Sequence, residues 1–230
     1  MIGLTELTNN KIDMNKIMFN DKYSLTQAVL EGLKTMTRRI FYIPDKLVPY
    51  LDIDDIFDIV DDCIIWKDKS DNIRMTFEPK YKVGEVVAIA QSYMDVDRFH
   101  RKGKNAAYLE YLDSILPELK LYPGWGNKMF VKADLMPHHI EITRIKVERL
   151  QDISDEDCLK EGIVKQEVIS DESPLIYAYD AFLNGESGYF ASQWFKRPKE
   201  AFAVLIDKVS DKGTWERNPF VWVYEFKLFD

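Results

Sequence analysis

Apolar residues in this chain fall into short segments with two different spacings, which indicates a mixture of strands and helices. Residues 86–90 form a continuous apolar run rich in β-branched residues, which predicts a buried strand. Residues 140–147 and 220–228 alternate in character and predict two longer strands. The apolar positions of the first of these change face near Thr143 and Arg144, which predicts a bulge or bend. Shorter strand candidates are 16–19 and 129–133.

Three segments have the apolar spacing of helices. Ser24 is a candidate N-cap, and the apolar residues after it recur at helical spacing until Gly32 ends the helix. Ser154 begins a second helix with an acidic residue three positions later, and Gly162 ends it. A third helix region covers 190–209 and is broken by a proline.

The order of these elements predicts the fold class. Strands separated by long and unequal connections, together with several helices, are typical of α+β proteins. Regular strand–helix alternation, a glycine-rich phosphate loop and a dinucleotide fingerprint are all missing from the sequence, which excludes Rossmann and P-loop enzymes. With 230 residues the chain is long enough for one large domain, and we expect a single domain over 1–230.

Two segments, about 45–80 and about 95–128, are expected to be insertions within this domain. In the first, the apolar residues of 53–60 recur at helical spacing and predict a helix with aspartates on its other faces. Residues 63–66 and 73–77 predict a small hairpin. The second insertion is polar and contains prolines and glycines.

Composition narrows the class of protein further. Hydrophobic residues make up 46% of the chain and charged residues 30%, which is the usual balance of a globular protein. No apolar run approaches the roughly 20 residues needed to span a bilayer, and the start has no signal-peptide pattern. Two cysteines, Cys63 and Cys158, are too few for a disulfide framework. We therefore expect a cytoplasmic protein without a membrane partner.

The charge is unevenly distributed. The net charge of −8 argues against a general nucleic-acid coat protein, and six aspartates between positions 50 and 62 supply much of it. Cations gather in two stretches, one near the start and one in the middle of the chain. The first contains Lys34, Arg38 and Arg39, and the second contains Lys128, Lys132, Arg144, Lys146 and Arg149, against Asp134, Glu141 and Glu148. If the fold brings these stretches together, an acidic protein would still present a cationic cleft to a phosphate.

The first of these stretches also carries a hydroxyl. Lys34, Thr37, Arg38 and Arg39 lie within six residues and could hold an anion or polarise a carbonyl. The alternative is a solvated basic turn. Trp125, between two glycines, could stack on a base, or it could anchor its loop by packing.

A metal centre is not expected. His138 and His139 are followed by Glu141, but adjacent histidines of a strand point to opposite faces and cannot bind one ion together. The aspartate-rich stretch lacks the glycine and the terminal glutamate of a calcium loop. We therefore predict neither a metal nor a cofactor.

The segment 32–39, Gly-Leu-Lys-Thr-Met-Thr-Arg-Arg, resembles the signature start of ASCH domains, which belong to the PUA-like superfamily. Further blocks resemble long phage- and prophage-type members in the same order: 81–93, 128–137, 140–149, 150–163 and 215–226. The two insertions and 165–188 have no counterpart in this resemblance. The resemblance implies a PUA-like small β-barrel with flanking helices and a cleft suited to RNA or a modified nucleoside.

The same resemblance implies a chemistry. Small bacterial ASCH members are amidohydrolases that remove the acetyl group of N4-acetylcytidine with a lysine, a threonine and a glutamate. These roles carry over to Lys34 and Thr37, which form the Lys-x-x-Thr motif, and to Glu161, at the end of the second helix. This chain is much longer than those enzymes and has Gln91 where long relatives usually place a glutamate. Whether it is an enzyme is therefore left open, and Lys34 and Glu161 could instead form a structural ion pair.

Two other functions are compatible with the sequence. One is a non-catalytic RNA-binding module, whose binding would be weak and salt-sensitive because few cations are available. The other is a phage-associated interaction protein that uses the acidic segment as its partner surface.

Overall fold

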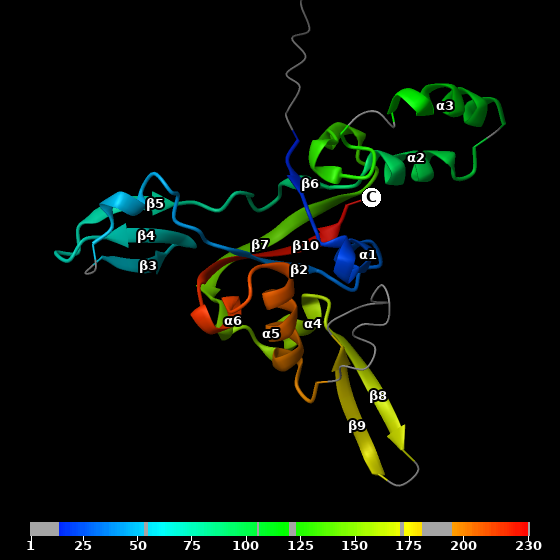
Figure 1. Ribbon diagram of the computed structural model, residues 1–230. Coiled ribbons are helices and arrows are strands. Elements are labelled where there is room, and N and C mark those ends of the chain that lie inside the picture. The colour runs from blue at the N-terminus through cyan, green and yellow to red at the C-terminus, as the bar shows by residue number, and fades with distance from the viewer. Residues whose placement is uncertain are drawn as a thin grey trace, which may run out of the picture. The chain divides into compact units, whose positions relative to one another are not determined.

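The computed structural model describes residues 14–52, 55–104, 106–119, 123–170, 173–180 and 195–229 (Figure 1). Within these ranges the fold is mixed α+β, as the sequence predicts. The chain divides into two compact units, one comprising Met1–Met18 and Val86–His139 and the other Phe19–Glu85 and Ile140–Asp230. None of the helices in the described ranges has the length and apolar character needed to cross a bilayer. The start of the third helix region, 190–194, lies outside the described residues.

The first unit contains two short parallel strands and two helices: β1 (Lys16–Ile17), β6 (Val86–Ile89), α2 (Tyr93–Arg101) and α3 (Ala106–Leu119). Helix α2 begins at Ser92, whose hydroxyl accepts the amide of Asp95 while the Asp95 carboxylate accepts the amide of Ser92. A small core joins β6 and α2 to the segment that follows α3: Ala88, Val96, Val131 and Met136. Strand β6 confirms the strand predicted at 86–90.

The predicted strand at 129–133 is wrong. Lys128–Phe130 form a 3-10 helix, and a second one covers Ala133–Leu135. The ammonium of Lys16 donates hydrogen bonds to the carbonyls of Lys128 and Val131, at 3.2 and 2.7 Å. Because these carbonyls point at one side chain, they are not available for a strand ladder.

The second unit is organised by an antiparallel sheet in which β10 lies between β7 and β2 (Figure 1). Its strands are β2 (Met36–Ile40), β7 (His139–Arg149) and β10 (Phe220–Leu228). Glu225 is opposite Arg144 and Phe226 is opposite Ile142, so that Thr143 has no partner in the ladder. The predicted bulge is therefore confirmed. It keeps Ile142 and Ile145, both buried, on one face of the sheet despite their odd spacing.

A separate three-stranded antiparallel sheet occupies the first predicted insertion: β3 (Ile56–Val60), β4 (Cys63–Lys67) and β5 (Ile73–Phe77). The predicted β4–β5 hairpin is confirmed, but the predicted helix over 53–60 is wrong where the structure describes it. Asp61 and Asp62 both have positive φ, 49° and 57°, and connect β3 to β4 as a two-residue turn. Pairing with β4 also stacks Phe57 on Trp66, and the β-branched residues of β3 suit an extended backbone.

Helices and one hairpin complete the second unit: α1 (Leu25–Leu30), α4 (Asp155–Lys160), α5 (Pro198–Val209), α6 (Thr214–Arg217), β8 (Val164–Ser170) and β9 (Ser173–Asp180). Further 3-10 turns are Asp21–Tyr23, Val48–Tyr50 and Leu150–Asp152. Ser154 caps α4 by accepting the amide of Asp157, as predicted, whereas Ser24 makes no side-chain cap because its own φ is 52°. Helix α5 begins at Pro198, where the missing N–H of proline costs no hydrogen bond.

Candidate functional site

Lys34 is positioned by the end of α1. The helix ends at Leu30, and Gly32 adopts φ 72°, a left-handed conformation that residues with a Cβ seldom take. The amide of Lys34 then donates to the carbonyl of Ala28 at 2.9 Å, which folds the chain back against the helix. As a result Lys34 is only 3% exposed, just before β2 begins.

Glu161 is positioned by the end of α4. The residue after it, Gly162, adopts φ 101° and turns the chain away from the helix axis. The amide of Thr35 donates to the carbonyl of Lys160 at 2.9 Å, which joins the start of β2 to the end of α4. Lys34 Nζ consequently lies 2.5 Å from Glu161 Oε2 and 2.8 Å from the Glu161 carbonyl oxygen.

Burial lowers the pKa of Lys34 below its ordinary value, because the charged ammonium loses its hydration. The Glu161 carboxylate opposes this effect through its charge and its hydrogen bond, while the nearby charges of Arg39 and Arg38 add to it. A lysine with a lowered pKa releases its proton more easily, and this is the usual way in which a lysine becomes a general base.

Arg38 binds the second oxygen of Glu161. Its Nη1 donates to Glu161 Oε1 at 3.0 Å, and its Nη2 donates to Glu148 at 2.6 Å and to Asp157 at 3.2 Å. The ammonium of Lys146 bridges Glu148 and Asp157 at 2.7 and 3.3 Å. Lys34, Arg38 and Lys146 thus form one cluster with the carboxylates of Glu148, Asp157 and Glu161, and Lys160 lies 3.7 Å from Asp157 at its edge. The side chain of Arg38 is 0% exposed, so its donors face these carboxylates inside the protein and not a phosphate in solvent.

Thr37 lies on the other face of β2 from Arg38, because successive residues of a strand point to opposite faces. It is 5% exposed and is paired across the ladder with Tyr224. Within the described residues, the Thr37 hydroxyl makes no hydrogen bond with Lys34 or Glu161. The structure therefore brings Lys34 and Glu161 into contact and leaves the threonine hydroxyl outside that contact.

Arg39 shares the Thr37 face of β2. Its guanidinium lies 5.6 Å from the centre of the Phe19 ring, and burial lowers its pKa. Two tyrosines lie close enough to Arg39 to interact with its charge, and their own rings meet edge to face at 5.2 Å: Tyr81 and Tyr224. Burial raises the pKa of Tyr81 to about 12, against the opposing charge of Arg39. This face of β2 therefore combines a hydroxyl, a guanidinium and two phenols in largely buried positions.

The cluster has the elements of proton transfer. The Lys34 ammonium and the Glu161 carboxylate are in direct contact and are shielded from water, so a proton can pass between them without solvent. An unpaired charge at this depth would be strongly destabilising, and each charge here has a partner of opposite sign.

The other predicted binding residues, Trp125, Lys128 and Lys132, belong to the first unit. Trp125 is half-buried, and its carbonyl accepts the amide of Met94 at the start of α2. Lys128 is half-buried and Lys132 is exposed. A Cβ at the neighbouring Gly124 would lie 2.6 Å from the ring of Tyr93, so glycine is required there for close packing against α2. This packing favours an anchoring role for the loop that carries Trp125.

The histidines of the sequence do not form a ligand set. The ring of His138 lies edge-on to Phe99, with 5.0 Å between the ring centres. Among the described residues there is no group of three or more histidine, cysteine or carboxylate side chains placed to hold a metal ion.

The sequence placed Lys146 and Glu148 in the second charged stretch but did not place them around Glu161, and it missed Asp157 as a site residue. Glu148 and Lys146 occupy the polar face of β7, and Asp157 lies one helical turn before Glu161. A polar face on a strand normally predicts that the face is exposed to solvent. The pattern therefore did not indicate that Arg38 would be buried against it. Tyr224 could have been found from the alternation of β10, which places it on the same face as Trp222.

Comparison of this chain with known protein families, with curated proteins and with solved structures finds no match.

Proposed function

We propose that this chain is a long ASCH-type protein with a PUA-like barrel, and that its cleft acts on the exocyclic amide of a modified nucleoside, with N4-acylated cytidine as the substrate class. The buried contact between Lys34 and Glu161 carries the proposal. The ASCH resemblance implies catalytic roles for both residues, Lys34 in the Lys-x-x-Thr motif and Glu161 in a helix far along the sequence, and the two side chains are in contact. Two free cysteines, one of them buried, suit a cytoplasmic setting.

A purely structural ion pair is the competing explanation. Replacing a buried ion pair by apolar residues is often neutral or stabilising, so packing alone gives little reason to keep this pair. The lowered pKa of Lys34 and the hydroxyl three residues later give a chemical reason.

The proposed reaction begins with attack on the acyl carbonyl. The neutral amine of Lys34 takes the proton of the Thr37 hydroxyl, whose oxygen adds to the carbonyl carbon. The bond from that carbon to the exocyclic nitrogen then breaks, and Lys34 or Glu161 returns a proton to the departing amine. Water hydrolyses the ester left on Thr37 and restores the hydroxyl. Direct attack by a water that Thr37 positions gives the same products.

Two movements are required before this reaction can occur. Lys34, Thr37 and Glu161 are 3%, 5% and 4% exposed, so neighbouring side chains must shift before a substrate reaches them. Lys34 must also turn from Glu161 towards Thr37, since Lys34 and Thr37 are not hydrogen-bonded to each other in the structure. Catalytic hydrogen bonds often tighten only in the substrate complex.

The test is deacetylation of N4-acetylcytidine, followed by its ultraviolet spectrum. We expect the wild type to turn over and Lys34→Met to lose at least about a hundredfold in rate. The matched control is Lys227→Met, which removes an exposed lysine of β10 whose ion pair with Glu141 lies outside the cluster, and it should keep activity. Circular dichroism verifies that both variants fold. Full turnover by Lys34→Met would refute the proposal, and no turnover by the wild type would favour the non-catalytic RNA-binding function.

A further inference from the structure

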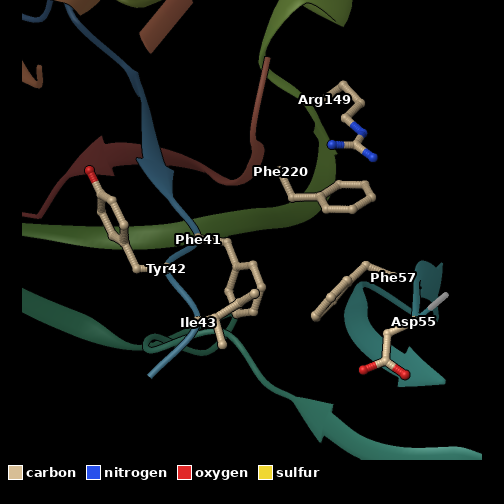
Figure 2. A pocket seen from close by; sticks show the side chains of 7 residues that line it. All are labelled: Phe41, Tyr42, Ile43, Asp55, Phe57, Arg149 and Phe220. Carbon is tan, nitrogen blue, oxygen red and sulfur yellow. The ribbon is translucent and has the colours of Figure 1, made fainter. Parts of the chain in front are cut away.

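A cleft elsewhere in the second unit takes no part in the proposed reaction. It is an open hollow of about 380 Å³ and is lined by Phe41, Tyr42, Ile43, Asp55, Phe57, Arg149 and Phe220. Figure 2 shows the rings of Phe41, Phe57 and Phe220 gathered around one space, with the Arg149 guanidinium beside Phe220. The volume lies in the range of small-molecule sites, and the lining combines aromatic rings with a few polar groups.

The register of the sheet explains why these side chains meet. Phe220 begins β10 and is paired with Arg149 at the end of β7, so their side chains lie on one face. The amide of Phe41 donates to the Phe220 carbonyl at 2.9 Å, which places the end of β2 alongside. Phe57 comes from β3, and its ring centre is 6.2 Å from that of Phe41. Four segments therefore contribute to the lining.

Arg149 is stacked on an aromatic ring and remains exposed. Its guanidinium carbon lies 3.6 Å from the centre of the Phe220 ring, and its Nη1 donates to the Asn218 carbonyl at 3.3 Å. These contacts hold the planar group in one orientation while its other donors can meet a ligand. Unlike Arg38, this arginine makes no ion pair with a carboxylate within the described residues.

Charge decides what kind of planar ligand fits. The lining also contains one carboxylate, Asp55, which accepts the amide of Asp52 at 2.8 Å and lies 3.9 Å from the Arg74 guanidinium. The fixed Arg149 guanidinium, which makes no ion pair among the described residues, disfavours a cationic guest, which otherwise suits an aromatic cage. It favours a ligand that combines a flat ring with an anionic group. The many exposed aspartates of the neighbouring turn and strand, among them Asp58, Asp61 and Asp62, oppose a long polyanion.

We propose that this cleft binds a single unpaired nucleotide, with the base among the three phenylalanine rings and the phosphate at Arg149. Unstacked bases are held in proteins by aromatic rings and arginine planes, and phosphates by guanidinium donors. The residues of this cleft are separate from Lys34, Thr37 and Glu161, so the proposal goes beyond the amide chemistry and does not depend on it.

Binding can be measured by isothermal titration calorimetry with the full chain. The probes are the four nucleoside 5′-monophosphates, the corresponding nucleosides and a short single-stranded oligonucleotide. We expect a monophosphate to bind more tightly than its nucleoside, and Phe57→Leu to weaken that binding roughly tenfold. Arg149→Gln should weaken the monophosphate and leave the nucleoside unchanged. Tighter binding of the oligonucleotide than of the monophosphate would show that the bound nucleotide comes from a single-stranded nucleic acid.

Controls separate this site from other effects. Phe130→Leu removes an exposed ring of the first unit and should leave binding unchanged. Lys34→Met should also bind the monophosphate normally, even if it abolishes amide hydrolysis. Arg149 is exposed, so Arg149→Gln tests the site even if Phe57→Leu disturbs folding. Absence of binding by every nucleotide probe, binding unaffected by both cleft variants, or preferential binding of tetramethylammonium would each overturn the proposal.

Discussion

The ammonium of Lys34 lies 2.5 Å from the Glu161 carboxylate, although 127 positions separate the two residues in the sequence. Both are almost completely buried, and the second oxygen of Glu161 is bound by Arg38. One carboxylate therefore balances two buried cations from opposite sides. Removing it would leave both without their shared partner, which makes Glu161 the central residue of the cluster.

We expect Glu161→Gln to lower the free energy of unfolding by about 3–5 kcal/mol, because breaking a buried ion pair leaves uncompensated charge. Urea denaturation measures this change. Glu141→Gln is the matched control, since Glu141 pairs with the largely exposed Lys227 and its loss should change stability by less than about 1 kcal/mol. Equal effects of the two substitutions would contradict the proposed importance of the buried contact.

Thr37 tests whether the site uses a hydroxyl. Thr37→Val keeps the branched shape but removes the oxygen, so we expect it to fold normally and to lose at least about a hundredfold in deacetylation rate. Thr37→Ser retains a hydroxyl and should keep part of the activity. Steady-state kinetics on N4-acetylcytidine distinguish the two, and equal rates for Val and Ser would exclude Thr37 as nucleophile or water ligand.

Gly162 holds the turn that follows Glu161. A Cβ there would meet Lys34 Cβ at 3.6 Å, an ordinary contact, so any penalty arises from its φ of 101°. We expect Gly162→Ala to destabilise the protein by about 1–3 kcal/mol. Gly126→Ala, where φ is not positive and the Cβ would find open space, should change stability by less than about 1 kcal/mol. Thermal denaturation compares them, and a neutral Gly162→Ala would show that this turn relaxes easily.

Alkaline pH should weaken the fold partly through Tyr81. Burial raises its pKa to about 12, from an ordinary value of 10.0. Between these values the unfolded chain releases the proton while the folded chain keeps it, so the free energy of unfolding falls as pH rises. Tyr81→Phe should reduce that fall between pH 10 and 12 in denaturation experiments. Tyr42→Phe, at an exposed position, should follow the wild type.

Local sequence features predicted the elements that depend on local chemistry. The apolar run of β6 and the capping serine of α4 each act on the backbone beside them. Pro198, which was expected to break a helix region, instead begins α5. The bulge at Thr143 could be predicted because the face of an apolar residue follows directly from its position.

Prediction failed where distant contacts decided the conformation. The apolar residues of 56–60 fit a helical period, but the turn at Asp61 and Asp62 and pairing with β4 make the segment a strand. Residues 128–130 form a 3-10 turn instead of a strand, and the Lys16 ammonium, supplied from far away in the sequence, binds the carbonyls of this segment. In both cases the partners of the backbone hydrogen bonds lie outside the segment itself, so its own residues do not reveal them.

The sequence by itself determined which residues were candidates for chemistry, because the resemblance that implies roles for Lys34, Thr37 and Glu161 rests on segments of the chain that can be read without the fold. Only the tertiary structure decided what each of them contacts. Arg38 was predicted as a phosphate ligand, yet its side chain is buried among carboxylates on the opposite face of β2 from Thr37. The cleft beside Arg149 was invisible in the sequence, because its walls come from four separate segments. Spacing along the chain shows which face of an element a side chain occupies, but the partner on that face depends on how distant elements pack.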